Sequence, residues 1–149
     1  MFRMRFKGLA AGVVVLSVVL AFSMLAVQAH ATTQKKPVPK TGTIVTPTPA
    51  LVAKGKALAA AHGCQGCHTI TGAKLTGPTW KGLAGSKVHL TSGKTVVATD
   101  SYLIGVITDP TTLMVEGYDA TVMSEMISPG SISTAEAKAL VAYIKTLKK

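Results

Sequence analysis

The stretch Cys64-Gln65-Gly66-Cys67-His68 decides how the rest of this chain is interpreted. Both cysteines of the 149-residue chain lie in it, three positions apart, and a histidine directly follows the second. This C-x-x-C-H pattern is typical of covalent haem c attachment. Thiols one helical turn apart can reach the same edge of a porphyrin, and the histidine beside them can then bind the iron from one face. The motif therefore predicts one haem c, tethered through Cys64 and Cys67, with His68 as an axial ligand.

The cysteine pair has three other possible interpretations. A thioredoxin-like redox dithiol needs a βαβ setting, whereas the flanks of this pair indicate helix and loop. Half of a zinc site needs a second Cys/His pair at zinc-finger spacing, and His30, His62 and His89 are scattered along the chain. A disulfide between cysteines so close in sequence would close a very small loop. The haem interpretation is favoured over all three.

The charge of the chain indicates the kind of partner to expect. Its formal net charge is +10, and from Thr32 onward thirteen lysines outnumber six acidic residues, which leaves +7. A lysine-rich surface favours steering toward a redox protein with an acidic docking surface, although a merely soluble basic surface would carry the same charge. Nucleic acid is not expected as a partner, because the lysines are dispersed, aromatic residues are few and no nucleic-acid motif is present.

Residues 1–31 have the features of an export sequence. A basic start is followed by residues 8–27, which are almost wholly apolar, and by Ala29-His30-Ala31, a small-x-small cleavage site. The apolar stretch is also about as long as the roughly 20 residues that a membrane-spanning helix needs. These residues are therefore either a signal peptide or an N-terminal membrane anchor. Both alternatives place the remaining chain on the extracytoplasmic, periplasmic side of the cytoplasmic membrane.

A linker is expected over residues 32–50, before a domain over residues 51–149. The linker holds four of the seven prolines, with threonine and lysine between them. Such a composition favours extended polyproline-like conformations, and nineteen residues at about 3.1 Å each would reach nearly 60 Å. A spacer of that reach favours retention of the N-terminal segment as a membrane anchor.

The domain itself is expected to be mainly helical. Gly63 is placed to end the first helix, and Gly55 inside that helix would allow close approach of another helix, with Tyr143 covering the notch. The elements are expected in this order: a helix over 51–63, a glycine-rich loop over 69–80, a hairpin over 88–97, a helix over 101–108, a methionine-bearing loop over 116–126 and a final amphipathic helix. The hairpin is expected to turn at Gly93, and the final helix to begin with a capping box from Ser133 to Glu136. The helix over 101–108 is expected to be capped by Asp100 and to bury the face formed by Tyr102, Leu103, Val106 and Ile107.

Several residues outside the motif are candidates for the haem site. A ligating histidine usually donates its other ring N–H to a carbonyl or carboxylate, and the carbonyl of Pro78 is the candidate acceptor. Trp80 either fills the core or donates its indole N–H to a haem propionate. A methionine thioether is a soft ligand suited to haem iron, and Met114, Met123 and Met126 are candidates, with core filling as the alternative for each.

With these elements placed, residues from about Leu51 to Leu147 resemble a class I monohaem cytochrome c. More narrowly, they resemble the cytochrome c domain of haem–copper oxidase subunit II. The matching residues are Gly55 and Leu58, Gly63-Cys-Gln-Gly-Cys-His-Thr69, Gly77-Pro78, Gly82, Gly85, Val88-His-Leu90, Gly93, Asp100-Ser-Tyr-Leu103, Asp109-Pro110, Gly117-Tyr118, Val122-Met123 and Leu140-Val-Ala-Tyr-Ile144.

The resemblance implies a mainly α, class I cytochrome c fold, in which the N- and C-terminal helices cross around one covalent haem, with a small β-hairpin insertion. It implies that Met123, five residues after Tyr118, is the sixth ligand of the iron. Ser124 stands where the family usually has proline, so Met126 remains an alternative ligand. The copper-binding cysteine pair of an oxidase subunit II is absent, so the chain corresponds to the cytochrome module alone.

The function implied is that of an electron carrier rather than an enzyme, passing single electrons in an extracytoplasmic respiratory chain to or within a terminal oxidase. Two alternatives stay open. One is a haem enzyme or small-molecule sensor with an open iron site. The other is an electron-transfer subunit of a dehydrogenase or of a nitrogen-oxide reductase.

Overall fold

The computed structural model of the protein describes residues 42–148. The export sequence expected over residues 1–31 and the first ten residues of the expected linker lie outside this range. Among the described residues, no helix is both long enough and apolar enough to cross a membrane.

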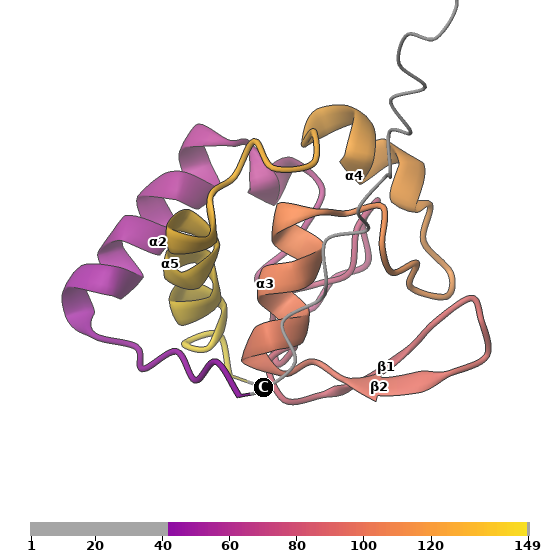
Figure 1. The fold of residues 1–149 in the computed structure, drawn as a ribbon, viewed down its shortest axis with the longest axis horizontal. Helices are drawn as coiled ribbons and strands as arrows, with labels where there is room; N and C mark the ends of the chain where they lie inside the picture. The colour runs from indigo at the N-terminus through magenta and orange to yellow at the C-terminus, as the bar shows by residue number, and fades with distance from the viewer. Residues whose placement is uncertain (1–41, 149) are drawn as a thin grey trace, which may run out of the picture. The chain divides into compact units, whose positions relative to one another are not determined.

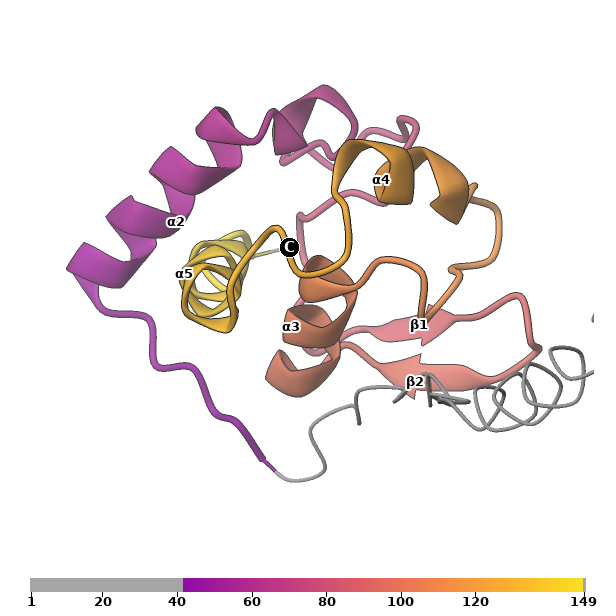
Figure 2. The same cartoon turned by 45° about the horizontal axis from the view of Figure 1, so that its top comes forward.

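Helices dominate the described domain (Figures 1 and 2). The longest of the helices in the described residues, α2, packs across the C-terminal helix α5, and α3 packs on α5 as well. The elements are α2 (Pro49–Ala61), the 3₁₀ turn η1 (Cys64–Gly66), β1 (Lys87–His89), β2 (Thr95–Val97), α3 (Asp100–Thr108), α4 (Ala120–Met126) and α5 (Thr134–Ile144). This arrangement of crossing terminal helices with one small hairpin is the one that the sequence predicts.

The crossing of α2 and α5 depends on a glycine. Gly55 is buried on α2, and a Cβ added there would overlap the backbone carbonyl oxygen of Ala139 on α5. The same Cβ would lie 2.9 Å from the Cβ of Tyr143. The two helix backbones are therefore in direct contact, and the predicted notch at Gly55, covered by Tyr143, is confirmed.

Helix α5 is the centre of the core. Seven of its residues are buried, from Ala137 to Ile144. The helix begins with the predicted capping box, in which the Ser133 hydroxyl accepts from the Glu136 N–H at 3.3 Å and the Glu136 carboxylate accepts from the Ser133 N–H at 2.9 Å. Because the Ser133 side chain and backbone donate to this carboxylate, the pKa of Glu136 is lowered.

An N-terminal strap, residues 43–48, packs onto the domain before α2 begins. Val45 is 4% exposed, and its N–H donates to the Asp100 carboxylate at 2.6 Å. The Lys145 ammonium lies 2.7 Å from that carboxylate and donates to the Val45 carbonyl at 2.7 Å. Helix α2 then starts at Pro49, with Thr48 as its N-cap. The last residues of the segment expected to be an extended linker are therefore part of the folded domain.

Helix α3 differs from its prediction at its N-terminus and in its buried face. Its N-cap is Thr99, whose hydroxyl accepts from the Tyr102 N–H at 3.2 Å. Asp100 is not the cap, because its carboxylate accepts hydrogen bonds from the Lys145 ammonium and from the Val45 N–H of the strap instead. The face against the core includes Ile104, which was not expected, while Tyr102 is only half-buried. Val106, which was also expected on this face, is half-buried too.

The predicted hairpin is present. Strands β1 and β2 pair antiparallel with Val88 opposite Val96, and the turn contains Gly93 with a φ of 75°. A single bridge between Leu90 and Val115 then joins the hairpin to the chain that leads into α4. The hairpin therefore helps to fix the segment that precedes the methionines.

The segment expected to be a methionine-bearing loop ends in a helix. Asp119 caps α4 by accepting from the Thr121 N–H at 2.9 Å. The helix is only seven residues long and contains β-branched residues, which give a weak sequence signal for helix. Its consequence for the site is that Met123 and Met126 stand three residues apart on one helix, where side chains lie on the same face.

Candidate haem site

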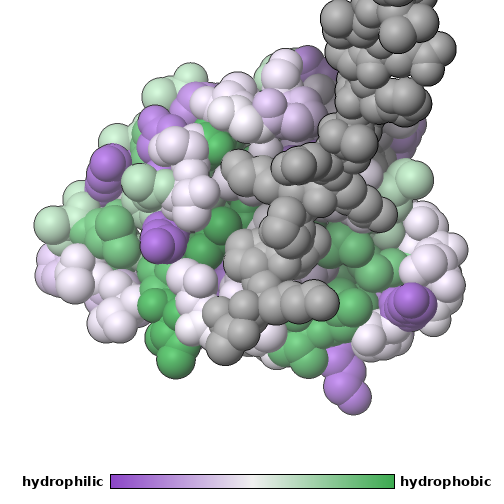
Figure 3. Space-filling model, viewed as in Figure 1, coloured by the Kyte–Doolittle hydropathy of each residue, from purple (hydrophilic) through white to green (hydrophobic). Residues whose placement is uncertain are grey.

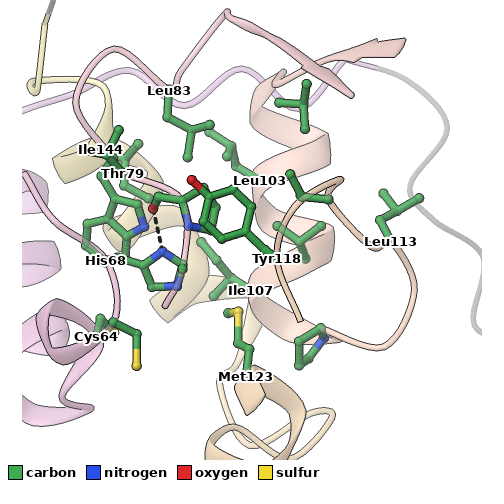
Figure 4. Close-up of a pocket in the computed structure, with 18 of the residues that line it drawn as sticks. Cys64, His68, Thr79, Leu83, Leu103, Ile107, Leu113, Tyr118, Met123 and Ile144 are labelled. Carbon is green, nitrogen blue, oxygen red and sulfur yellow. Dashed lines mark hydrogen bonds between the residues drawn. The ribbon is translucent and has the colours of Figure 1, made fainter. Parts of the chain in front are cut away.

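A cavity of about 550 Å³ lies between the attachment motif, α3, α4 and α5 (Figure 4). Its volume falls in the range of about 300–1,000 Å³ that is typical of cofactor sites. Most of the lining is apolar, and this part of the site was not predicted as a set from the sequence. The main apolar contributors are Leu83, Leu103, Ile107, Leu113, Leu140 and Ile144.

The attachment motif lies at one end of this cavity. Gly63 adopts a left-handed conformation with a φ of 64° and ends the turn that follows α2, as expected from its sequence position. The chain then folds into η1, and the His68 N–H donates to the Cys64 carbonyl at 2.9 Å. Cys64 and Cys67 both line the cavity, and burial raises the pKa of the Cys64 thiol. The motif thus presents both thiols and the imidazole to one space.

The ring of His68 has a defined tautomer. Its Nδ1 lies 2.8 Å from the carbonyl oxygen of Pro78, and because a carbonyl can only accept, Nδ1 carries the proton. This contact is the one expected from the sequence, and it leaves Nε2 free to bind a metal. Burial lowers the pKa of His68, and the Pro78 carbonyl opposes this shift. A neutral imidazole is the form that coordinates metal ions.

The loop after the motif is shaped around this imidazole. The Gly77 N–H donates to the Cys67 carbonyl at 2.9 Å, which holds Gly77 beside the ring. A Cβ added at Gly77 would lie 2.5 Å from Cε1 of His68. The glycine is therefore required for space, because any larger residue would displace the imidazole or the loop.

Trp80 is in the core and also contacts the site. It is 6% exposed and stacks on the His68 ring, with centroids 5.4 Å apart and an interplanar angle of 23°. Its backbone N–H donates to the Thr69 carbonyl at 2.8 Å, which fixes the residue next to the motif. The sequence predicts either core filling or an indole hydrogen bond to a haem propionate for Trp80, and it does not indicate the stack on His68.

The three candidate methionines differ in where they lie. Met123, on α4, is half-buried and points into the cavity (Figure 4). Met126 also lines the cavity but is 70% exposed, and Met114 is 49% exposed and outside the lining. A thioether that binds iron within an apolar cavity has to leave water, so the burial favours Met123.

Polar residues line the cavity as well. Tyr118 lies in the lining, and the ammonium of Lys74 sits 5.6 Å from the centroid of its ring. His62 is half-buried and also lines the cavity. The charged residues of the lining are Lys81, Lys87, Glu116 and Asp119.

These residues fit a covalently attached haem. Two thiols on one turn, a neutral imidazole with a free Nε2 and a thioether all face one largely apolar cavity. The rival interpretations fit less well, because the sheet in residues 42–148 is a two-stranded antiparallel hairpin rather than part of a βαβ unit. In the same residues, no three His, Cys, Asp or Glu side chains gather as a zinc site would require.

Comparison with known proteins agrees with this geometry. Residues 52–148 match the family model described as cytochrome c. The chain belongs to the cytochrome c family. The cofactor of this family is covalent haem c, for which Cys64 and Cys67 supply the attachment motif, and its general role is electron transport.

Among solved structures, an engineered cytochrome c from Rhodothermus marinus, bound to a carbene intermediate, is similar to this chain. The TM-score is 0.44 at 16% sequence identity, over 74% of this chain and 88% of that chain. No curated protein matches the chain significantly.

Proposed function

We propose that this cytochrome c carries single electrons, with His68 and Met123 as the two axial ligands of its haem iron. The observation that supports this most directly is that both side chains face the one cavity that Cys64 and Cys67 also line. A bound haem c supplies one reversible electron at its iron. The thioethers formed by the two cysteines would keep the group in place through repeated oxidation and reduction.

The protein residues determine what else the iron could do. His68 comes from the attachment motif and Met123 from α4, so two separate elements supply the two axial positions. If His68 and Met123 both held the iron, the protein would leave no open position on it for a substrate. The largely apolar lining would also disfavour water as a ligand of the iron. These features favour a carrier over an enzyme or sensor with an open iron site.

The visible spectrum of the ferric protein tests this proposal. Methionine ligation of ferric haem gives a weak charge-transfer band at the red end of the visible range. We expect this band in the wild type, its loss in Met123→Ala and its retention in the matched control Met126→Ala. Persistence of the band in Met123→Ala would assign the ligand to Met126 instead. A high-spin ferric spectrum in the wild type would contradict the carrier function and support an open iron site.

We also propose that the carrier works at the extracytoplasmic face of the cytoplasmic membrane and passes electrons to or within a terminal oxidase. The pattern of residues 1–31 and the resemblance to oxidase subunit II domains support this location and partner. Mass spectrometry of the mature protein tests the location, because it shows the N-terminus and the haem together. Copurification with a dehydrogenase or a nitrogen-oxide reductase, rather than with an oxidase, would contradict the proposed partner and identify another.

The partner is proposed to dock through an acidic surface. Residues 42–148 hold nine lysines and six acidic residues, a net charge of +3. The cavity lining itself holds two acidic residues, Glu116 and Asp119, and two lysines, Lys81 and Lys87, so the net positive charge that would attract an acidic partner lies on the rest of the domain. On the face seen in Figure 3, hydrophilic and hydrophobic residues are interspersed. We expect the electron-transfer rate with the oxidase to fall as salt is raised, because salt screens exposed charges. A rate that rises with salt would contradict an acidic docking surface.

A further inference from the structure

We propose that Trp80 is a positioning residue for His68, and that Tyr143 supports Trp80 from α5. This inference depends on the proposed function, because it takes His68 to be an axial ligand. It assigns to the only tryptophan of the chain a task that neither core filling nor a propionate bond would explain.

The contact with His68 is a stack between ring faces. The centroids of His68 and Trp80 are 5.4 Å apart and the rings are inclined by only 23°. The hydrogen bond to Pro78 fixes a single atom of the imidazole, Nδ1, at 2.8 Å. A ring held at one atom can still tilt about that contact. Face-to-face contact with Trp80 restricts this tilt, and therefore the direction in which Nε2 points.

Trp80 is itself held in place. Its backbone N–H donates to the Thr69 carbonyl, one residue beyond His68. Its indole meets the Tyr143 ring edge-on, with centroids 6.3 Å apart and an interplanar angle of 83°. Such edge-to-face pairs stabilise a fold by more than the burial of their apolar area alone. The indole therefore has a fixed position against which the imidazole can rest.

Tyr143 connects this ring contact to the rest of the fold. The Gln65 side-chain amide, between the two cysteines, donates to the Tyr143 hydroxyl at 3.2 Å. The Tyr143 Cβ lies against Gly55, where α2 and α5 cross. Three rings in sequence, those of Tyr143, Trp80 and His68, thus connect the crossing of the terminal helices to the ligand. The orientation of the ligand is set by the same packing that builds the core.

The orientation of His68 has a chemical consequence. Donation from Nδ1 to a carbonyl raises the basicity of a ligating imidazole, and a more basic ligand favours the ferric state. Loss of the stack would let the ring tilt away from the Pro78 carbonyl and weaken this bond. We therefore expect the reduction potential to rise, and the g-values of the ferric protein to change, when Trp80 loses its aromatic face.

The experiment compares holoprotein of Trp80→Leu, Trp80→Phe and Val141→Ala by electron paramagnetic resonance and potentiometry. Val141→Ala is the matched control, because Val141 is fully buried on α5 but does not line the cavity. We expect shifted g-values and a higher potential in Trp80→Leu, and values close to the wild type in Trp80→Phe and Val141→Ala. Unchanged values in Trp80→Leu would overturn the proposal. Equal shifts in Val141→Ala would also overturn it, because they would show that general loosening of the core is sufficient.

A second measurement needs no variant. In the reduced wild-type holoprotein, nuclear Overhauser effects between the ring protons of Trp80 and those of His68 report the stack directly. Their presence supports the proposal, and their absence overturns it even if Trp80→Leu yields too little holoprotein to study. Failure of either test leaves the methionine charge-transfer band intact, so it is distinct from failure of the proposed function.

Discussion

Substitution of Gly55 by alanine sets two effects of opposite sign against each other. Alanine is favoured over glycine inside a helix by about 1 kcal/mol. At this position the added Cβ would overlap the Ala139 carbonyl oxygen and lie 2.9 Å from the Tyr143 Cβ. Overpacking of a core costs about 1–3 kcal/mol, and the upper end applies because the obstructing atom belongs to a helix backbone. We expect a net loss of about 2 kcal/mol of unfolding free energy.

The assay is urea and thermal unfolding of the holoprotein, followed by far-ultraviolet circular dichroism. For a domain of this size, 1 kcal/mol corresponds to about 4–8 °C in Tm, so we expect Tm to fall by roughly 8–16 °C. Gly105→Ala is the matched control: Gly105 lies inside α3, and no neighbouring atom lies within 4 Å of its Cβ position. That variant should be as stable as the wild type or up to about 1 kcal/mol more stable. If Gly55→Ala is also stabilised, direct backbone contact at the helix crossing is refuted.

Three further substitutions test other parts of the structure. Asp100→Asn removes the ion pair that fastens the strap, and we expect a loss of about 1.5–3 kcal/mol in urea unfolding, as for hydrogen bonds to charged groups; an unchanged midpoint would show that this ion pair contributes no stability. Gly77→Ala places a Cβ 2.5 Å from the His68 ring, so we expect altered haem absorption and a lower yield of holoprotein, and a wild-type spectrum would contradict the close approach. Ser133→Ala removes the cap of α5 and should cost about 1 kcal/mol. Because the folded pKa of Glu136 is lowered, the stabilisation from the Ser133 hydroxyl donating to its carboxylate is present above the unfolded value of about 4.5 and lost as pH falls through the lowered pKa. The bond from the Glu136 N–H to the Ser133 hydroxyl does not titrate, so the stability difference between the two proteins should become smaller in acid unfolding without vanishing.

Local patterns in the sequence were sufficient to predict much of the fold and the attachment motif. The cysteine spacing, the capping box of α5 and the glycine at the helix crossing each depend on a few neighbouring residues or on the absence of one side chain. The same holds for the hydrogen bond from His68 to Pro78, because Pro78 lies ten residues further along a short loop.

Features that depend on contacts between distant residues could not be predicted. Val45 gives no sign in the sequence that it would bury itself beside Asp100, 55 residues away. The stack of Trp80 on His68 depends on how the loop folds back on the motif, which periodicity does not report. Helix α4 was not predicted because it has only seven residues of weak helix propensity, and a cap at Asp119 does not by itself distinguish a short helix from a turn.

The N-terminal strap fixes the place where the polypeptide enters the domain. That place is beside the start of α3 and the end of α5, where Val45 is bonded to Asp100 and Lys145. In both Figures 1 and 2, α4 and η1 lie at the other end of the domain. A fusion partner, an affinity tag or a surface-immobilisation linker joined ahead of the strap would therefore pull on the end remote from Cys64 and Met123. The end that carries those two residues would stay accessible to a redox partner or to an electrode.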